Sequence, residues 1–329
     1  MTYNRQKRIL VTGAGGFIGS HLTELLVEKG YDVTAFVRYN SKGDWGWLEY
    51  SKYKDEIKVV TGDIRDYDSV LSTMKSCDEV FHLAALIGIP YSYISPLAYI
   101  QTNITGTYNI LQAARELEIS KLMVTSTSET YGSAQYVPID EYHPMVGQSP
   151  YSASKIGADQ LAISYFRSFG LPVKIVRPFN TYGPRQSARA FIPSVISQIM
   201  AGAKEIKLGN LHPTRDLTFV EDTASGFLAI AEAEGLYGEF TNIGMKEEIP
   251  MGDLANIIAK LSGKEIKIIT DSQRIRNDKS EVDRLFCSND KIKKFTNWKP
   301  EYNLESGLTK TIAWIGDNMQ FFKSEIYNV

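Results

Sequence analysis

The most restrictive feature of the sequence is a run of glycines directly after a short apolar segment. In "RILVTGAGGFIGSHL" the apolar run leads into Gly13, Gly16 and Gly19, spaced three residues apart, and then into a helical pattern. Glycine allows a tight turn, lets backbone amides approach a pyrophosphate, and lets a helix pack closely on a strand. The amino end of that helix favours a bound anion. A strand, a glycine turn and a helix in this order predict a dinucleotide-binding unit.

Short apolar runs alternate with helical patterns through the first half of the chain. Such runs are typical of buried strands, and the segments between them, such as "TYNILQAARELE", are typical of helices. Alternating strands and helices form right-handed βαβ units and a parallel sheet. The predicted strands are residues 8–13, 32–37, 57–63, 78–85, 121–128 and 172–180. The sequence therefore predicts an α/β fold of the Rossmann type, a doubly wound parallel sheet that binds ligands at the carboxyl ends of its strands.

The regular alternation ends after residue 180. "FIPSVISQIMAG" and "MGDLANIIAKLSGK" are predicted helices, and "EIKLG" and "EIKIIT" are predicted short strands. We expect residues 1–180 to form the dinucleotide-binding domain, with residues 216–245 returning to it. Residues 181–215 and 246–329 are expected to form a smaller C-terminal α/β part that binds the substrate and caps the sheet.

Composition narrows the classes of function. The 329 residues are 43% hydrophobic and 22% charged, with a formal net charge of −2. These values are typical of a soluble globular protein and lack the positive excess of a nucleic-acid or membrane binder. Cys77 and Cys287 are far apart and show no metal-ligand spacing, so neither a metal site nor a disulfide framework is predicted. Without a signal segment or a long apolar run, the chain is expected to be cytoplasmic.

The residues after the second and third predicted strands bear on which dinucleotide binds. An acidic residue after the second strand would hydrogen-bond the ribose 2′-hydroxyl of NAD, but this chain has Arg38 there. A guanidinium can pair with the 2′-phosphate of NADP, or stack on adenine while NAD binds. The sequence leaves both open, with a slight preference for NADP. Asp63 is expected to meet the adenine amino group, whereas Asp66 is better placed to cap a helix.

Two further segments carry reactive side chains. "YSASK" places Tyr151 and Lys155 four residues apart, on one face of a helix that is predicted to begin at Ser149 and Pro150. An ammonium beside a phenol favours the phenolate, so Tyr151 can take a proton from a substrate hydroxyl. "TSTSE", at the end of the fifth strand, finishes with Glu129. That carboxylate is either a solvated surface group or a second base.

Together these motifs resemble the extended short-chain dehydrogenases/reductases that modify nucleotide sugars. The resemblance covers about residues 7–320 and includes "HLAA", Asn103 in "TNITGT", "RPFNTYGPR" and "TRDLTFVED". It implies a cofactor site made of Gly13, Gly16, Phe17, Ile18, Gly19, Arg38, Asp63, Ile64, Tyr151 and Lys155. It also implies that Asn180, Arg215 and Arg276 bind the nucleotide diphosphate of the substrate, since arginine pairs with phosphate oxygens.

Within this family, Thr127, Ser128 and Glu129 resemble the Thr-(Asp/Ser)-Glu triplet of sugar 4,6-dehydratases. Oxidation of C4 to a ketone acidifies the proton at C5, and a base must remove it before water is eliminated across C5 and C6. The resemblance assigns Glu129 to that step, Thr127 to a hydrogen bond with O4, and Tyr151 to the C4 hydroxyl. Ser128 stands where dTDP-glucose dehydratases have aspartate, so Glu129 or a water is expected to protonate the C6 hydroxyl.

The leading prediction is an NAD(P)-dependent nucleotide-sugar 4,6-dehydratase, which is a lyase. "FVRYNSKGDWGWLE" and "ALIGIPYSYISP" resemble bacterial dehydratases of legionaminic-type sugar synthesis, which implies nucleotide-linked N-acetylglucosamine and leaves GDP and UDP open. The closest alternative is a UDP-glucuronate decarboxylase, but those enzymes usually have Y-D-E-G-K in place of "YSASK". A 4-epimerase would leave Glu129 without a task. A non-catalytic cofactor-binding protein would not need the intact catalytic set.

Two predicted long helices point to self-association. Residues 96–118 and 150–169 carry apolar positions on more than one face, and the sheet covers only one of them. In the family such helices pair across a twofold axis, so the resemblance implies a homodimer with a four-helix bundle.

Trp45 and Trp47 lie in the loop that would follow the cofactor's ribose, and the alternative is that they only anchor that loop in the core.

Overall fold

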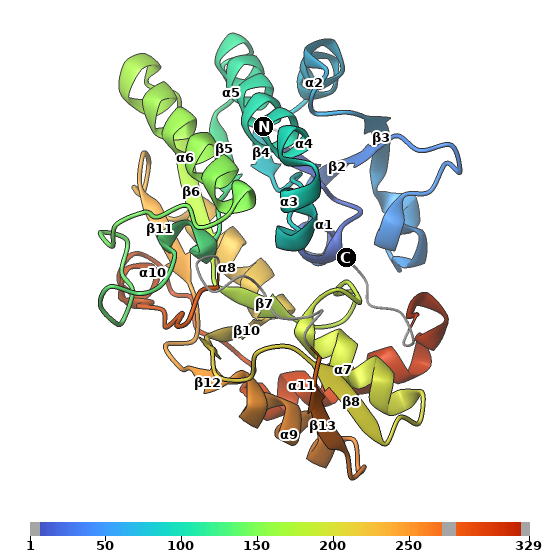
Figure 1. The fold of residues 1–329 in the computed structure, drawn as a ribbon. Coiled ribbons are helices and arrows are strands. Elements are labelled where there is room, and N and C mark those ends of the chain that lie inside the picture. Colours follow the sequence, from blue (N-terminus) through green and yellow to red (C-terminus); the bar gives the residue numbers. More distant parts are fainter. Residues whose placement is uncertain (1–6, 272–280, 324–329) are drawn as a thin grey trace.

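The computed structural model describes residues 7–271 and 281–323. Its main sheet has seven parallel strands in the order β11-β6-β5-β4-β1-β2-β3 (Figure 1). The strands are β1 Arg8–Thr12, β2 Asp32–Arg38, β3 Lys58–Gly62, β4 Glu79–His82, β5 Lys121–Thr125, β6 Val173–Pro178 and β11 Phe240–Ile243. Because the order reverses between β1 and β4, the sheet is doubly wound, and the predicted fold class is confirmed.

Helices cover both faces of this sheet (Figure 1). One face carries α1 Phe17–Glu28 and α8 Val220–Glu232, and the other carries α2 Tyr67–Met74, α5 Gly106–Glu116 and α6 Pro150–Phe169. Each layer of helices encloses its own buried apolar cluster, with Leu22 and Phe227 in one, and Ile110 and Ala162 in the other. The strands are therefore apolar on both faces, which is why they were recognisable as continuous hydrophobic runs.

Two neighbouring strands, β4 and β5, end earlier than predicted, and β4 borders the point where the sheet order reverses. The segment 78–85 is a strand only as far as His82, and the next two amides, of Leu83 and Ala84, donate to the Thr12 hydroxyl at 3.2 and 3.1 Å. A side-chain acceptor thus competes with the strand ladder and turns the chain out of the sheet. The segment 121–128 likewise leaves the sheet after Thr125.

The two predicted long helices differ in regularity. Helix α6 spans Pro150–Phe169 as predicted, and the Ser149 side chain accepts from the amide of Ser152 at its start. The segment 96–118 is instead divided into α4 Pro96–Tyr99, a π-helical turn Ile100–Thr105, and α5. The π turn buries Asn103, whose carboxamide bonds both backbone groups of Leu86 at 2.8 and 2.9 Å. Such turns often occur at functional sites.

The smaller part of the structure lies beyond one end of the sheet (Figure 1). It contains three two-stranded pairs and several helices around a separate apolar cluster. The pairs are β7 Asn180–Tyr182 with β10 Leu217–Phe219, β9 Thr214–Arg215 with β12 Ile249–Pro250, and β8 Glu205–Leu208 with β13 Lys267–Thr270. The helices around this cluster are α7 Phe191–Met200, α9 Met251–Leu261 and α11 Leu304–Asp317, whereas α10 Asp290–Phe295 packs on β11 and α8 of the main sheet. Strand β7 begins directly after β6, so this part adjoins the carboxyl edge of the sheet.

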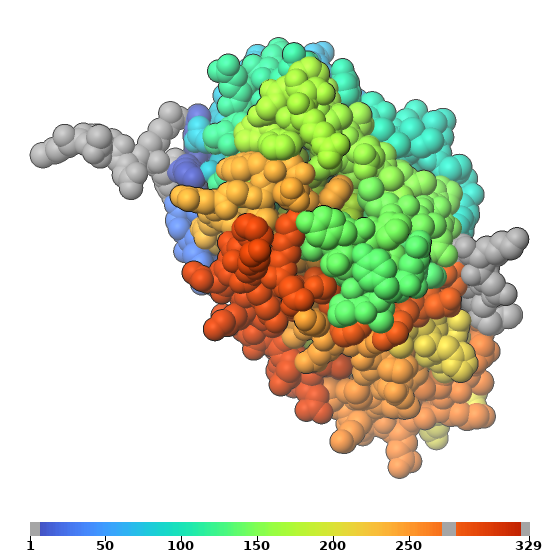
Figure 2. Space-filling model, turned by 90° about the vertical axis from the view of Figure 1, so that its left-hand side faces the viewer, coloured from blue at the N-terminus to red at the C-terminus, as the bar shows by residue number. Residues whose placement is uncertain are grey.

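A long loop before α6 is held by the C-terminal region. Ile139 forms a parallel bridge with Cys287, in which Ile139 donates to the Phe286 carbonyl at 2.7 Å and Ser288 donates to the Ile139 carbonyl at 2.8 Å. Figure 2 shows this loop in green against the red-orange segment. Within residues 7–271 and 281–323, no helix has both the length and the apolar character needed to cross a membrane.

Candidate active site

The glycine turn after β1 is too tightly folded for side chains. Gly13 has a φ of +70°, and its carbonyl accepts from the amide of Gly16 at 3.0 Å. A Cβ on Gly19 would lie 2.2 Å from that same carbonyl oxygen. Helix α1 begins at Phe17, so the first-turn amides, including that of Ile18, have no intrahelical acceptor. A tight glycine turn that leads into free helix amides fits a pyrophosphate group.

A fourth glycine, which the sequence analysis did not single out, is equally constrained. A Cβ on Gly15 would lie 2.3 Å from the carbonyl oxygen of Trp45, and the amide of Trp47 donates to the Gly15 carbonyl at 3.0 Å. The Trp47 ring packs edge-on against Trp314 and Phe321 at centroid distances of 5.3 and 5.2 Å. Trp47 therefore anchors the loop, and the loop backbone in turn supports the glycine turn.

The ends of β2 and β3 bring the predicted adenosine contacts together. Arg38 is exposed and its charge acts on Asp63, although the larger cause of the lowered Asp63 pKa is a hydrogen bond from Arg65. The Arg65 Nε lies 2.9 and 3.0 Å from the two carboxylate oxygens of Asp63. Ile64 is buried. Asp66 accepts from two amides at the start of α2, so its predicted capping role is confirmed.

A buried histidine joins the two strands that flank the switch point. His82 Nδ1 lies 2.8 Å from the Thr12 hydroxyl, and Nε2 lies 3.1 Å from the Thr107 hydroxyl. Thr107 donates its own proton to the Asn103 carbonyl at 2.6 Å, so Nε2 must be the donor and Nδ1 the acceptor. Burial, with a contribution from the charge of Lys155, lowers the pKa of His82 to about 3. The imidazole is therefore neutral.

Helix α6 presents the predicted catalytic pair in a buried setting. Burial raises the pKa of the Tyr151 phenol, a hydrogen bond with Thr127 lowers it, and the charge of Glu129 raises it. Burial lowers the pKa of Lys155, whose Nζ donates to the carbonyl of Thr125 at 2.6 Å. The opposing influence on the phenol thus comes from Thr127.

The chain after β5 carries the predicted triplet of Thr127, Ser128 and Glu129. The Thr127 hydroxyl accepts from the Glu129 amide at 3.3 Å, and a short 3₁₀ turn follows at Ser128–Tyr131. Thr127 and Glu129 are partly exposed, whereas Ser128 is 2% exposed. Thr127 shares a hydrogen bond with the Tyr151 phenol, and the charge of Glu129 acts on the pKa of that phenol. Three of the predicted catalytic side chains therefore act on one another, and Ser128 is buried between Thr127 and Glu129 in the chain.

The predicted substrate residues lie on the small strand pairs. Asn180 begins β7, where it aligns with Leu217 of β10, and its buried Oδ1 has no hydrogen-bond partner among the residues described. Such an acceptor fits a site that a ligand completes. Arg215 on β9 is buried and pairs with Glu281 at 3.3 Å. Arg276 falls within 272–280, outside the described residues.

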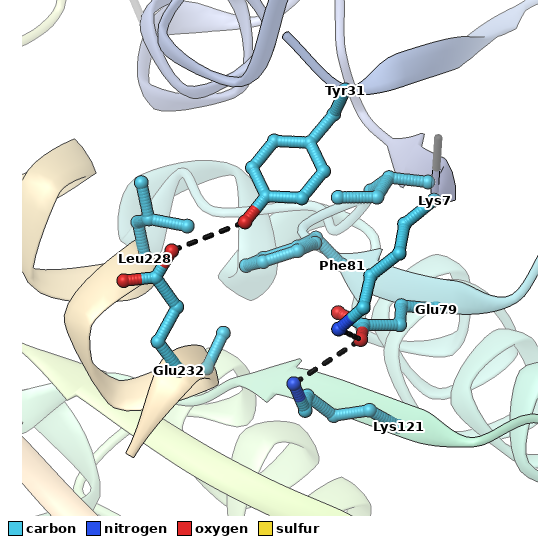
Figure 3. A pocket seen from close by; sticks show the side chains of 9 residues that line it. Lys7, Tyr31, Glu79, Phe81, Lys121, Leu228 and Glu232 are labelled. Atoms are coloured by element: carbon cyan, nitrogen blue, oxygen red, sulfur yellow. Dashed lines mark hydrogen bonds and ion pairs between the residues drawn. The ribbon is translucent and has the colours of Figure 1, made fainter. Parts of the chain in front are cut away.

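A separate cavity of about 280 Å³ lies at the opposite, amino edge of the sheet (Figure 3). Glu79 in its wall accepts from Lys7 at 2.7 Å and from Lys121 at 3.2 Å. Tyr31 and Glu232 close the other side with a hydrogen bond of 3.1 Å. Its polar groups are paired with one another, and none of the predicted site residues lines it. Ligands of doubly wound folds bind at the other edge.

Comparison with known proteins gives a consistent picture. A family model described as GDP-mannose 4,6 dehydratase matches residues 10–311. The chain is 32% identical to a UDP-glucuronate 4-epimerase of Thermodesulfobacterium geofontis, over 96% of this chain and 98% of the relative. It is 30% identical to a dTDP-glucose 4,6-dehydratase of Streptomyces antibioticus, over 96% and 94%. The solved structure of DesIV, a dTDP-glucose 4,6-dehydratase from Streptomyces venezuelae with NAD bound, superposes with a TM-score of 0.86 at 28% identity, over 96% and 99%.

Proposed function

Because the chain belongs to the family described as GDP-mannose 4,6 dehydratase, within the extended short-chain dehydrogenases/reductases that act as nucleotide-sugar dehydratases and epimerases, we propose that it is a nucleotide-sugar 4,6-dehydratase. One observation carries the choice of dehydratase, namely the position of Glu129. Its carboxylate shares the end of β5 with Thr127 and acts on the phenol of Tyr151. A second acid–base group next to the first is what elimination requires and simple epimerisation does not.

We assign NAD as the cofactor. The glycine turn, the free amides of α1 and the side chains of Arg38, Asp63 and Ile64 would hold it. The slight preference for NADP gains no support from the comparisons, since the related DesIV structure carries NAD. The pairing of Asp63 with Arg65 keeps a carboxylate next to Arg38, which weakens the case for a 2′-phosphate contact. When bound, the nicotinamide accepts a hydride from C4 and returns it at C6.

Tyr151 and Thr127 act at the C4 hydroxyl in this proposal. Thr127 hydrogen-bonds O4, and the phenolate of Tyr151 takes the hydroxyl proton as the hydride leaves C4. Lys155 supports the charged phenolate from one turn along the same helix. The C4 hydroxyl becomes a ketone, and both electrons of the broken C–H bond leave with the hydride.

Glu129 acts next, because the new ketone makes the C5 proton acidic. The carboxylate takes that proton and passes it to the C6 hydroxyl, which leaves as water as the C5–C6 double bond forms. A hydride from the bound cofactor would then saturate C6, and C5 would take up a proton that is balanced by the one Tyr151 took from the C4 hydroxyl. The products are one water and a 4-keto-6-deoxy sugar that remains attached to its nucleotide.

Asn180, Arg215 and Arg276 would hold the nucleotide diphosphate. The Asn180 Oδ1, which has no hydrogen-bond partner within residues 7–271 and 281–323, and the buried Arg215 guanidinium support this assignment. We further assign the sugar as N-acetylglucosamine, on the resemblance of the two sequence stretches quoted above.

A 4-epimerase is the second candidate, because a UDP-glucuronate 4-epimerase is 32% identical over nearly the whole chain. Product mass separates the candidates. After incubation with a panel of GDP- and UDP-sugars, a dehydratase product has lost the mass of one water. An epimerase product keeps the mass of its substrate, and a decarboxylase product has lost the mass of CO₂.

Replacement of Glu129 by glutamine tests the proposed role directly. The amide keeps the size of the side chain but cannot accept a proton, so dehydration should fall by about 10²–10³-fold. Hydride transfer from C4 should survive, so reduced cofactor should accumulate and be visible by its absorbance. Tyr151→Phe should suppress that absorbance. Glu28→Gln, at an exposed position on α1, is the matched control and should behave as wild type. If Glu129→Gln forms the dehydrated product at nearly the wild-type rate, Glu129 is not the C5 base; a wild-type product that keeps the mass of its substrate would instead favour the epimerase.

We also propose that the protein forms a homodimer through α4, α5 and α6. Large apolar side chains remain exposed along this region, with Ile94 at 68%, Leu97 at 62% and Ile100 at 48%. Tyr108 on α5 adds a further exposed ring. Several such side chains in neighbouring turns suit burial against a second copy.

A further inference from the structure

A fully buried ion pair joins helix α6, which carries Tyr151 and Lys155, to strand β6, and it has no role in the proposed mechanism. Asp159 is 0% exposed and Arg177 is 1% exposed, and the Arg177 Nη2 lies 2.9 Å from the Asp159 Oδ2. The Ser126 hydroxyl completes the group, since it donates to the same Oδ2 at 2.6 Å and accepts from the Arg177 Nε at 3.2 Å. Burying two charges is costly unless the geometry is closely satisfied. The pair therefore invites a functional explanation.

The group joins the two elements that carry the reactive side chains. Asp159 lies one turn after Lys155 and two turns after Tyr151 on α6. Ser126 directly precedes Thr127, and its amide donates to the Val176 carbonyl of β6 at 2.7 Å. The carboxylate of Asp159 thus fixes the catalytic helix against the end of β5.

The same carboxylate also acts electrostatically on the catalytic pair. Its charge raises the pKa of Lys155, against the lowering that burial causes, and it contributes to the raised pKa of Tyr151. The Oδ1 of Asp159 is buried and makes no hydrogen bond within the described part of the chain. The titratable and charged groups around Tyr151 and Lys155 are Asp159 on α6, His82 on β4, Glu129 after β5, Tyr99 on α4 and the more distant Arg177 on β6.

We propose that Asp159 is a positioning residue of the reaction, which holds Ser126 and Thr127 after the end of β5 against helix α6 and places a fixed negative charge one turn from Lys155. This inference rests on the proposed roles of Tyr151 and Lys155. It adds a third member to the helix face, at a spacing of four residues from Lys155.

The pH dependence of kcat/KM tests this assignment. Activity requires a deprotonated Tyr151 and a protonated Lys155, so these groups set the acid and alkaline limbs. Asp159→Asn removes a negative charge that raises the pKa of both Tyr151 and Lys155. Each limb should therefore move to lower pH by about one unit. Ser126→Ala keeps all charges, so it should lower the rate without moving either limb. A variant with a merely structural defect loses rate at every pH and leaves the limbs in place.

Two further variants keep the test decisive. Asp222 is another buried carboxylate, on the other face of the sheet, and Asp222→Asn should leave the limbs in place even if stability falls. If Asp159→Asn does not fold, the double variant Asp159→Asn/Arg177→Met removes the unpaired buried cation and should move both limbs in the same direction but by less, because the more distant positive charge of Arg177 is lost as well.

Limbs that superpose on those of the wild type, in whichever of these variants folds, would overturn the inference. An unchanged rate in Ser126→Ala would overturn the part of the inference in which Asp159 positions the end of β5 through Ser126. Tyr151→Phe is measured in parallel. If it keeps its activity, the proposed function itself fails, which is a different outcome from an unmoved profile in an enzyme that depends on Tyr151.

Discussion

The neutral histidine at the switch point makes a quantitative prediction about stability. Burial lowers the pKa of His82 from 6.5 to about 3, so the folded protein does not take up a proton there until the solution is strongly acidic. The unfolded chain does so near pH 6.5. The contribution of His82 to stability is therefore fully present above pH 6.5 and is lost as the pH falls toward 3.

The size of the effect follows from these two values. At about pH 5 the unfolded chain gains about 2 kcal/mol from protonating this one side chain, because the pH is then about 1.5 units below its unfolded pKa. His82→Gln removes the titrating imidazole, so the variant should lack this part of the stability that the wild type loses in acid. The variant should also lose about 1 kcal/mol at all pH values, since glutamine cannot reproduce both bonds, to Thr12 and to Thr107.

Urea unfolding gives the free energy of unfolding of wild type and variant at about pH 8 and pH 5. The test compares how much of this free energy each protein loses between the two pH values. This comparison is needed because other groups contribute. Burial lowers the pKa of His21 to about 4 and adds to the loss, whereas burial raises the pKa of Asp216 to about 7 and opposes it. His212→Gln, at an exposed position, is the control. If His82→Gln loses as much stability between the two pH values as wild type, His82 is not held neutral and the reasoning is wrong.

Three further predictions concern ligands and assembly. Arg38→Asp should weaken NADP binding by about 10–100-fold and change NAD binding much less, as measured by cofactor titration; unchanged NADP affinity would show that Arg38 makes no phosphate contact. Arg215→Ala should raise KM by about 10–100-fold with a smaller change in kcat, because it removes charge-assisted bonds to phosphate; an unchanged KM would remove Arg215 from the site. Light scattering should give twice the 36.9 kDa chain mass, and Leu97→Glu should shift it toward the monomer; a wild-type monomer at micromolar concentration would contradict the dimer.

The parallel sheet was predictable because its strands are buried on both faces. Runs such as 9–11 and 122–124 are continuous apolar segments bounded by polar residues, and that pattern has few other interpretations. The start of α6 was equally clear, because a serine followed by proline satisfies and preorganises a helix terminus. In each of these places the local signal and the tertiary environment agree.

The remaining features depend on neighbours that are distant in sequence. The close approach of Trp45 to Gly15 comes from the path of a loop 30 residues away, and no local pattern encodes it. The π turn that interrupts the segment 96–118 is favoured by the bonds of Asn103 to Leu86, which form only when the chain is folded. No local pattern distinguishes Asp159 from other polar residues of a helix, because its partner Arg177 lies on β6 and meets it only in the folded chain.

The burial of Ser128 bears on how one carboxyl group can serve two proton transfers. Thr127 and Glu129 are partly exposed and Ser128 is buried, and a serine hydroxyl is in any case too weak an acid to act as a carboxyl group does. Under the proposed mechanism, the proton taken from C5 and the proton given to the leaving C6 hydroxyl are equal in number. A single Glu129 that accepts the first and delivers the second therefore balances the elimination without a separate acid. The serine at position 128 is then compatible with dehydration, because the position that holds aspartate in dTDP-glucose dehydratases is not needed as a proton donor in this chain.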